Sequence, residues 1–259
     1  MNEHLPTSVA LRQRVALRDS TAGLFRDANS LEELLPFTVS LVRSRIALHK
    51  AVQIRHAAYA RHVPVFAESL RQPESTDSDD GVVVLLAESK LDGTPLGTMR
   101  IQTNCFAPLS VEQSIELPSS LRERPLAEAT RLGVTDGHIG RVVKSVLFKA
   151  YYQYCLHAGI EWMVIAGRSP IDRQYDRLLF NDVYPNLGYV PLRHANNMPH
   201  RIMSFEIATA RARWTQANHP LLGFMCETHH PDIDITGVRP SLAQQFALPQ
   251  PADAIPFSM

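Results

Sequence analysis

The sequence predicts an α/β protein with a mixed central sheet, antiparallel where it begins and parallel in its middle. Strand-like runs on both sides of the Asp92-Gly93 turn signal, between residues 81 and 103, predict an antiparallel hairpin. A long helical pattern separates two further strand-like segments, 126–135 and 161–167, and predicts a right-handed parallel crossover. A mixed, mostly antiparallel sheet flanked by helices therefore accounts for the middle of the chain.

The segments before the hairpin alternate between helical and extended patterns. Residues 8–35 show amphipathic helical spacing, and Ser30 followed by Glu33 has the spacing of a capping box. Residues 36–42 are rich in Val, Phe and Thr and predict a strand, and the apolar spacing over 44–62 predicts a helix. The next polar run, RQPESTDSDD, is acidic and nearly free of apolar groups, so we expect an exposed and mobile loop.

The clearest predicted element is a helix over residues 138–158. Its apolar residues recur with a period of about 3.6 and define one buried stripe. These residues are Ile139, Val142, Val143, Val146, Leu147, Ala150, Tyr151, Tyr154 and Ala158. Asp136 or Thr135 can cap the helix, and Gly159 can end it.

The chain is expected to form one core with an extension at each end. The core spans residues 37–209 and finishes with a short helix over 170–181 and a strand over 201–209. The extensions are an N-terminal helical segment, 1–36, and a C-terminal segment, 210–259, whose proline-rich end is not expected to be regular.

Composition excludes several classes of function. The 26 basic and 26 acidic residues balance, so no net field drives binding to nucleic acid or to an anionic membrane. The isolated cysteines Cys105, Cys155 and Cys226 argue against a disulfide framework and for a reducing compartment. No apolar run has the length of a membrane-spanning helix or of a signal-peptide core, so we expect a cytoplasmic protein with no integral membrane segment.

Four short motifs occur in a recognisable order along the core. They are IRHAAYARH with Arg55 and Tyr59, GTMRI with Arg100, EATRLGV with Glu128 and Arg131, and YPNLGY with Tyr184 and Gly188. Together with the order of the elements, they resemble the GNAT acyltransferase superfamily, and within it the N-acyl amino acid synthases and the acyl-homoserine-lactone (autoinducer) synthases. The resemblance covers residues from about 37 to 209.

The resemblance implies an N-acyltransferase that moves a long-chain acyl group from a carrier thioester to the α-amine of an amino acid. The sequence departs from the homoserine-lactone enzymes in RQPESTDSDD, which lacks their loop tryptophan and favours an ordinary amino acid over S-adenosylmethionine as acceptor. The phosphate loop of the superfamily is reduced to DGHIGR, which favours acyl carrier protein over acyl-CoA as donor.

Two alternative functions remain open from the sequence. One is an acyl-homoserine-lactone synthase or a generic acyl-CoA-dependent GNAT enzyme. The other is a GNAT-like module without catalysis that binds an acyl carrier.

Acyl transfer to an amine needs a base, a polarised carbonyl and a protonated leaving thiolate. Glu128 is the candidate base, directly or through a water, and partial burial would raise its pKa to suit that role. A structural ion pair with Arg131 or Arg100 is the alternative. Because Arg131 follows three residues later, a regular strand points it and Glu128 to opposite faces.

The arginines on the strands are candidate acceptor-binding residues. Arg100 is expected to grip the carboxylate of an amino acid, unless it is a solvated strand residue. Arg131 is expected either to hold the sheet and the active-site loops, or to meet that carboxylate, or to make a purely structural salt bridge. By resemblance, Arg55 and Tyr59 on the first helix also belong to the substrate site.

A splay between the two parallel strands is expected to seat the pantetheine arm of the donor, just after Arg131. By resemblance the arm runs along Leu132 and Val134, and Gly133 permits a bulge that frees a backbone N–H for the thioester oxygen. Tyr184, again by resemblance, is the proton donor to the departing thiolate, with a packing tyrosine as the alternative.

The exposed side of the long helix carries Arg141, Lys144 and Lys149, which are expected to receive the acidic helix of acyl carrier protein. A solvated helix face is the alternative. No cofactor or metal is expected besides the acyl donor. No familiar metal-site spacing occurs among the candidate ligands His219, Cys226, His229 and His230.

Overall fold

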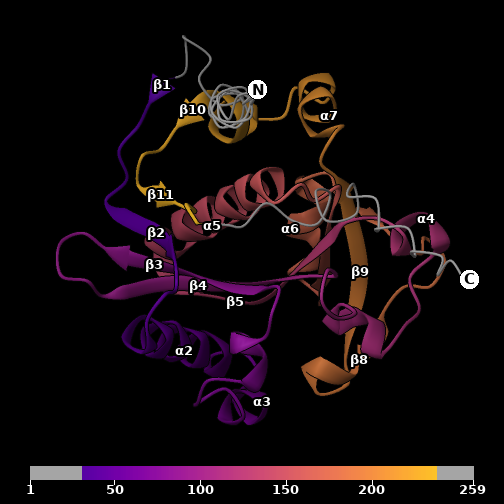
Figure 1. Cartoon of the computed structure of the whole chain (residues 1–259), viewed down its shortest axis with the longest axis horizontal. Coiled ribbons are helices and arrows are strands. Elements are labelled where there is room, and N and C mark those ends of the chain that lie inside the picture. Colours follow the sequence, from indigo (N-terminus) through magenta and orange to yellow (C-terminus); the bar gives the residue numbers. More distant parts are fainter. Residues whose placement is uncertain (1–30, 238–259) are drawn as a thin grey trace, which may run out of the picture.

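The structure is a computed structural model that describes residues 31–237. A nine-stranded sheet runs through the molecule in the order β11-β2-β3-β4-β5-β6-β9-β7, with β8 paired to β9 (Figure 1). Its central strands are β2 (Phe37–Leu41), β3 (Val82–Ser89), β4 (Pro95–Thr103), β5 (Leu126–Val134), β6 (Trp162–Gly167) and β9 (Met198–Glu206). The short strands are β1 (Leu31–Glu32), β7 (Asn181–Asp182), β8 (Val190–Leu192), β10 (Thr228–His229) and β11 (Ile233–Asp234).

The topology confirms the predicted mixed sheet. From β2 to β5 each strand pairs antiparallel with the next, and β6 then pairs parallel with β5. The crossover between β5 and β6 is the predicted long helix, α5 (Gly137–His157). Asp136 caps it by accepting a hydrogen bond from the Gly137 N–H at 2.8 Å.

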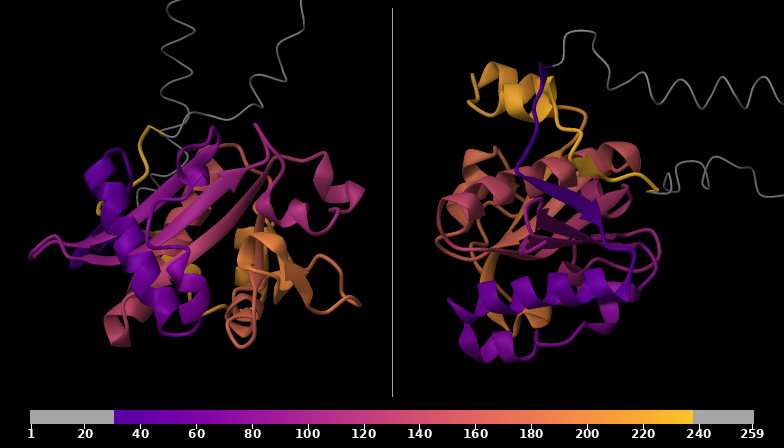
Figure 2. Two further views of the ribbon diagram at one scale, coloured as in Figure 1. Left: turned by 90° about the horizontal axis from the view of Figure 1, so that it is seen from below. Right: turned by 90° about the vertical axis from the view of Figure 1, so that its left-hand side faces the viewer.

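Helices cover the two faces of the sheet. The helices α2 (Arg45–Ala60) and α3 (Pro64–Glu68) lie on one face and α5 lies on the other, as Figures 1 and 2 show. Glycines allow close packing on both faces, because a Cβ at Gly97 would stand 2.6 Å from Val143 of α5. A Cβ at Gly133 would stand 3.1 Å from the Cα of Arg55 in α2.

The remaining helical elements are short. They are η2 (Ser75–Ser78), η3 (Ser110–Gln113), α4 (Ser119–Arg122), α6 (Asp172–Arg177), η4 (Arg193–Ala195), α7 (Ala210–Gln216) and η5 (Gly223–Glu227). None of the helices in the described range has the length and apolar character needed to cross a bilayer.

Three clusters of buried side chains form the core of the described residues. The largest lies between α5 and the sheet and includes Tyr151, Phe205 and Trp214. The second lies where the segment between β4 and β5 folds over the sheet, and it includes Val111 and Leu192. The third is small and joins α2 to β3 through Ala51, Val84 and Leu86. The second cluster borders the candidate site described below.

The two ends of the described chain meet. β1 pairs parallel with β10, and β11 pairs parallel with β2 at the edge of the large sheet. The helical prediction for residues 8–35 is therefore wrong over 31–35, where β1 replaces the expected turn; the rest of it, and the proline-rich end, lie outside the described residues. The chain after residue 209 supplies an edge strand and Trp214 to the core, so it packs as part of the same unit.

Lys149 corrects the predicted exposed patch on α5. Its side chain is buried, and its Nζ donates to the carbonyls of Phe224 and Thr228 at 2.5 Å each and lies 2.8 Å from Nδ1 of His230. Burial lowers the pKa of this lysine to about 8. The segment 223–230, which follows the predicted core in sequence, covers this side of the helix. Lys149 therefore does not lie on a surface that a carrier protein can reach.

Replacing Lys149 by Met is expected to destabilise the fold by about 2 kcal/mol, because two partly buried carbonyls lose their donor. The relief of burying a charged amine offsets part of this loss. Urea denaturation measures the change, and hydrogen exchange over residues 223–230 locates it. Lys144→Met on the same helix is the control, because Lys144 is only half-buried and its amine donates to the side chain of Gln174 rather than to backbone carbonyls. Equal stabilities of the two variants would contradict this account of Lys149.

Candidate active site

The parallel strands part inside the sheet. The β5-β6 ladder begins at Leu126 with Trp162 and ends at Ala129 with Ile165, whereas β5 continues to Val134. The predicted splay is therefore confirmed, but it begins two residues before Arg131 rather than after it. On its other side, β5 stays paired with β4 as far as Val134. The last residues of β5 thus have one edge that β6 does not cover.

A β-bulge in β5 changes which side chains face the site. Opposite Thr98 and Arg100 of β4 stand Gly133 and Thr130, so Arg131 and Leu132 share the place of one residue. Arg131 has a φ of 54°, in the left-handed region. Its guanidinium lies 5.3 Å above the Phe66 ring of α3, on the same face as the side chain of Thr130, which contacts Arg100.

Two expectations are corrected by this bulge. Arg131 and Glu128 do not point to opposite faces of the sheet, because the extra residue turns Arg131 toward α3. The irregular position is Arg131 rather than Gly133. Gly133 instead faces α2, where its missing Cβ allows the helix to approach.

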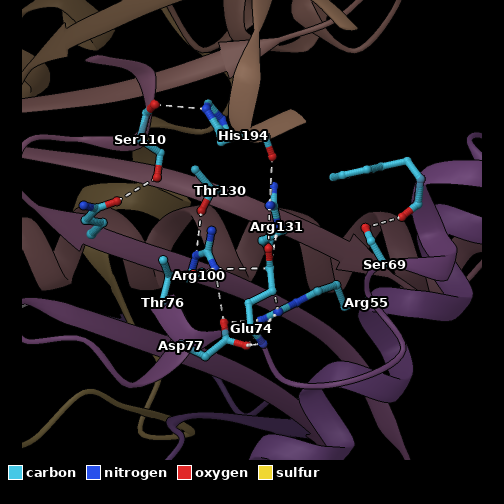
Figure 3. Close-up of polar contacts among 12 residues, drawn as sticks. Arg55, Ser69, Glu74, Thr76, Asp77, Arg100, Ser110, Thr130, Arg131 and His194 are labelled. Carbon is cyan, nitrogen blue, oxygen red and sulfur yellow. Dashed lines mark hydrogen bonds and ion pairs between the residues drawn. The ribbon is translucent and has the colours of Figure 1, made fainter. Parts of the chain in front are cut away.

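The acidic segment after α3 is not the exposed, mobile loop that its composition predicted. It folds over the sheet, and Glu74 and Asp77 pair there with Arg55, Arg100 and Arg131 (Figure 3). These five side chains are called the charge cluster below. Asp77 accepts hydrogen bonds from Nη1 and Nη2 of Arg55, both at 2.9 Å. Glu74 accepts from Nε and Nη2 of Arg131, both at 2.7 Å.

Charge pairing sets the ionisation of the cluster. Burial alone would raise the pKa of Glu74 and of Asp77, but the hydrogen bonds and charges of the arginines hold both pKa values below the ordinary range. Both carboxylates are therefore ionised at neutral pH. Three guanidiniums against two carboxylates leave the charge cluster with one positive charge in excess.

The arginines of the cluster have distinct partners. Arg55 is fully buried and is committed to Asp77 and Glu74. Arg100 donates from Nε to Thr130 at 3.1 Å and from Nη1 to Glu74 at 3.1 Å and to Thr76 at 2.5 Å. Its Nη2 has no acceptor within residues 31–237. Arg100 is thus not a solvated strand residue.

Arg131 ties three elements together. Besides its paired bonds to Glu74, its Nη2 donates to the backbone carbonyl of His194 in η4 at 2.9 Å. It therefore joins β5 to η2 and η4, which matches the expectation that it holds the sheet and the loops around the site. Tyr59 of α2 lies beside the cluster, with its ring 5.8 Å from that of Phe66, and burial raises the pKa of its phenol.

Glu128 lies next to the charge cluster and is completely buried. Its Oε2 accepts the Val111 N–H at 3.0 Å, and its Oε1 has no hydrogen-bond partner among the described residues. Burial raises the pKa of this carboxyl from 4.5 to about 7, against the opposing effect of the Val111 N–H and of Arg100 and Arg131. A carboxyl with a pKa near 7 exchanges protons readily at neutral pH, which suits a general base.

His194 is a residue of this site that the sequence did not indicate. Its Nε2 lies 3.9 Å from Oε1 of Glu128, and its Nδ1 lies 3.0 Å from the carbonyl oxygen of Ser110. Burial lowers the pKa of His194 to about 4, so it is neutral at pH 7. Only a short turn places it there, in which Asn196 and Asn197 both adopt a φ of 54°. An isolated His before two turn-forming Asn residues carries no periodic signal.

The other predicted residues lie around or outside this cluster. Leu132 and Val134 pack their side chains against the larger core, so only their backbone faces the splay. The hydroxyl of Tyr184 donates to the carbonyl of Glu116. Arg141 is exposed and Lys144 is half-buried.

The candidate metal ligands do not form a site in the part of the chain that the structure describes. No group of three or more His, Cys, Asp or Glu side chains is placed there to hold a metal ion. His219 and His230 instead contact backbone or side-chain atoms, since Nε2 of His219 lies 2.6 Å from the Arg177 carbonyl and His230 contacts Lys149.

No protein-family model and no curated protein matches the sequence. The fold is nevertheless similar to that of solved structures. The chain is similar to FeeM, an N-acyl amino acid synthase from uncultured soil microbes, at 15% identity over 70% of this chain and 96% of that chain, with a TM-score of 0.52. It is also similar to BjaI, a CoA-dependent acyl-homoserine lactone synthase with bound SAM and isopentyl-CoA. That likeness has 16% identity over 78% of this chain and 97% of that chain, with a TM-score of 0.52. The expected GNAT-like fold is thereby confirmed.

Proposed function

We propose that this chain is an N-acyltransferase that moves a long-chain acyl group from an acyl carrier protein thioester to the α-amine of an amino acid. The observation that carries the proposal is the position of Glu128. A buried carboxyl with a pKa of about 7, whose Oε1 has no partner within residues 31–237, stands beside the place where β5 and β6 part. A thioester in that opening would meet an amine held at Glu128.

The splay supports a donor with a narrow arm. Beyond Ala129, β5 has one edge without a β6 partner, and backbone groups on that edge would suit the amides of a pantetheine chain. The Val134 carbonyl is excluded from this role, because it accepts a hydrogen bond from Arg61. The oxygen of the thioester needs an N–H donor when its carbon becomes tetrahedral. Backbone N–H groups at Leu132 to Val134 remain our candidates, and Tyr184 remains the candidate proton donor to the thiolate.

The charge cluster supports an acceptor that carries a carboxylate. Its excess positive charge favours an anionic group near Glu128, and so does Nη2 of Arg100, which has no acceptor in the described part of the chain. An α-amino acid brings an amine and a carboxylate within a few bonds of each other. The cluster therefore favours an amino acid over a simple amine.

The N-terminus of α5 favours a carrier protein over coenzyme A. The Asp136 carboxylate accepts the hydrogen bond of the Gly137 N–H. A negative charge therefore lies where the pyrophosphate of a nucleotide would approach. A donor whose phosphopantetheine continues into a protein brings less negative charge to that helix end. BjaI is a CoA-dependent synthase. The central control is therefore to compare acyl carrier protein with coenzyme A as the acyl donor.

The test supplies the pure protein with fatty acyl carrier protein or fatty acyl-CoA and a mixture of amino acids, and identifies products by mass spectrometry. We expect a new amide on one amino acid, formed faster from the carrier protein. A lactone product or strict dependence on CoA would identify the alternative enzymes. Binding of the carrier without any product from either donor would contradict the proposal.

Charge reversal at Arg141 and Lys144 tests where the carrier docks. The double change Arg141→Glu and Lys144→Glu is expected to lower kcat/KM for the carrier protein by about 10-fold, because two attractive contacts become repulsive. With acyl-CoA or a short acyl-pantetheine as donor the loss should be much smaller. Added salt should lower kcat/KM of the unmodified protein for the carrier protein. The difference in kcat/KM between the unmodified protein and the double variant should then become smaller. Equal losses with all donors would place the docking surface elsewhere.

A further inference from the structure

The His194 ring and the Glu128 carboxyl lie next to each other without a direct hydrogen bond. Nε2 of His194 and Oε1 of Glu128 are 3.9 Å apart, too far for a direct hydrogen bond. Both groups are nearly or fully inaccessible, with side-chain exposures of 9% and 0%. Oε1 has no other partner among the described residues. A buried carboxylate oxygen without a donor is costly, so Oε1 calls for a group that brings a hydrogen.

The hydrogen bond to Ser110 fixes which nitrogen of His194 carries the proton. A carbonyl oxygen only accepts, so the contact of 3.0 Å requires a hydrogen on Nδ1. In the neutral ring the lone pair then lies on Nε2 and points toward Glu128. Arg131 holds the backbone of His194 through its carbonyl, which keeps this orientation. Nε2 of His194 and Oε1 of Glu128 are thus two neighbouring acceptors.

We propose that Nε2 of His194 and Oε1 of Glu128 form a two-acceptor site for the reacting amine, and that His194 is a catalytic residue that touches the attacking nitrogen. This inference rests on the proposed N-acyl transfer. A primary ammonium has three hydrogens and can satisfy both acceptors at once. Neither a thiol nor a hydroxyl offers two donors.

The protons balance through this site. The acceptor enters as R–NH₃⁺ and passes one proton to the Glu128 carboxylate, while a second N–H stays bonded to Nε2 of His194. The freed lone pair forms the C–N bond with the thioester carbon, and the C–S bond breaks. The departing thiolate takes a proton from Tyr184, the candidate donor, and Tyr184 regains a proton from the one that the new amide nitrogen loses. Glu128 returns its proton to water. His194 remains neutral and directs the lone pair.

Two substitutions test the roles of the two ring nitrogens of His194 separately. His194→Asn can still donate to Ser110 but loses the acceptor at the Nε2 position, and we expect kcat/KM for the amine to fall by about 10- to 100-fold. His194→Gln places an amide oxygen near the Nε2 position and should lose less. Wild-type turnover in the Asn variant would overturn the proposal, as would equal losses in both variants.

Nitrogen NMR of His194 in the full chain tests the site without turnover. We expect the ring to stay neutral with the proton on Nδ1 between pH 6 and 8, under the nearby charges of Arg100 and Arg131 and beside His200. Methylammonium should shift the Nε2 resonance, whereas tetramethylammonium, which has no N–H, should not. A proton on Nε2, or equal responses to the two ions, would overturn the proposal.

The kinetic experiment and the NMR experiment together show whether the proposed function or the proposed amine site is wrong. If wild-type protein transfers no acyl group but shows the expected tautomer and methylammonium response, the proposed function fails and the amine site stands. If acyl transfer proceeds and His194→Asn does not slow it, the function stands and the role of His194 fails.

Discussion

Replacing Glu128 by Gln is expected to lower turnover by about 100-fold or more and, at the same time, to make the protein more stable above pH 7. Turnover falls because an amide cannot accept the proton of the amine. Stability rises because the buried carboxyl has a pKa of about 7 in the folded chain against 4.5 when solvated. The folded state therefore keeps a proton that the unfolded state loses as pH rises from 4.5 to 7.

The sign and size of the stability effect follow from that difference. The contribution of Glu128 is fully present below pH 4.5 and is lost as pH rises through 7, at a cost of about 3 kcal/mol. The Gln variant lacks this loss. Its amide oxygen can accept the Val111 N–H, and its NH₂ group can face Nε2 of His194.

Denaturant titrations of both proteins from pH 4.5 to 8.5 measure the difference. The curves should agree at the acid end and diverge with rising pH, which makes the acid end an internal control. Other titrating groups affect both proteins alike and cancel. Parallel curves would show that Glu128 has an ordinary pKa, and unchanged turnover would remove it from the mechanism.

Replacing Asp77 by Asn is expected to destabilise the fold by about 3–5 kcal/mol. Asp77 and Arg55 are both buried with side-chain exposures of 0%, and they form a two-point ion pair. Losing the charge leaves Arg55 in a buried site with three guanidiniums against one carboxylate. The segment over the sheet should then open, which hydrogen exchange at residues 74–78 would register.

The surface pair of Glu68 and Arg71 provides the matched control. It is also a two-point pair, because Nε and Nη2 of Arg71 donate to the Glu68 carboxylate at 2.6 Å and 2.8 Å. The Glu68 and Arg71 side chains, however, are 61% and 58% exposed. Glu68→Gln is expected to leave the stability nearly unchanged, because solvent screens an exposed pair. Chemical denaturation of the two variants side by side gives the comparison. Similar losses would mean that burial does not strengthen the pairing of Asp77.

The regular elements around the site followed from the sequence because their signals are local. The period of α5, the Asp92-Gly93 turn and the apolar run of β6 each lie within one short window. Their order also fixed the parallel crossover and hence the splay. Glu128 could be assigned as the candidate base because it lies on the strand beside that splay.

The charge cluster could not be predicted because its signal is not local. Composition alone treats RQPESTDSDD as solvated, whereas its burial depends on arginines from α2, β4 and β5 that the fold brings together. The bulge at Arg131 has the same origin, since its side chain binds Glu74 far along the chain. Lys149 was misjudged because the segment that covers it starts more than 70 residues later, at Phe224.

The meeting of β2 with β11 has a consequence for how the chain is made. β2 belongs to the first part of the described chain to leave the ribosome, and β11 to the last. Until β11 emerges, β2 presents an open backbone edge to other nascent chains. Translation that stops before this point would release a truncated product that contains most of the sheet. Its edge strand would lack a partner, so we expect this product to aggregate.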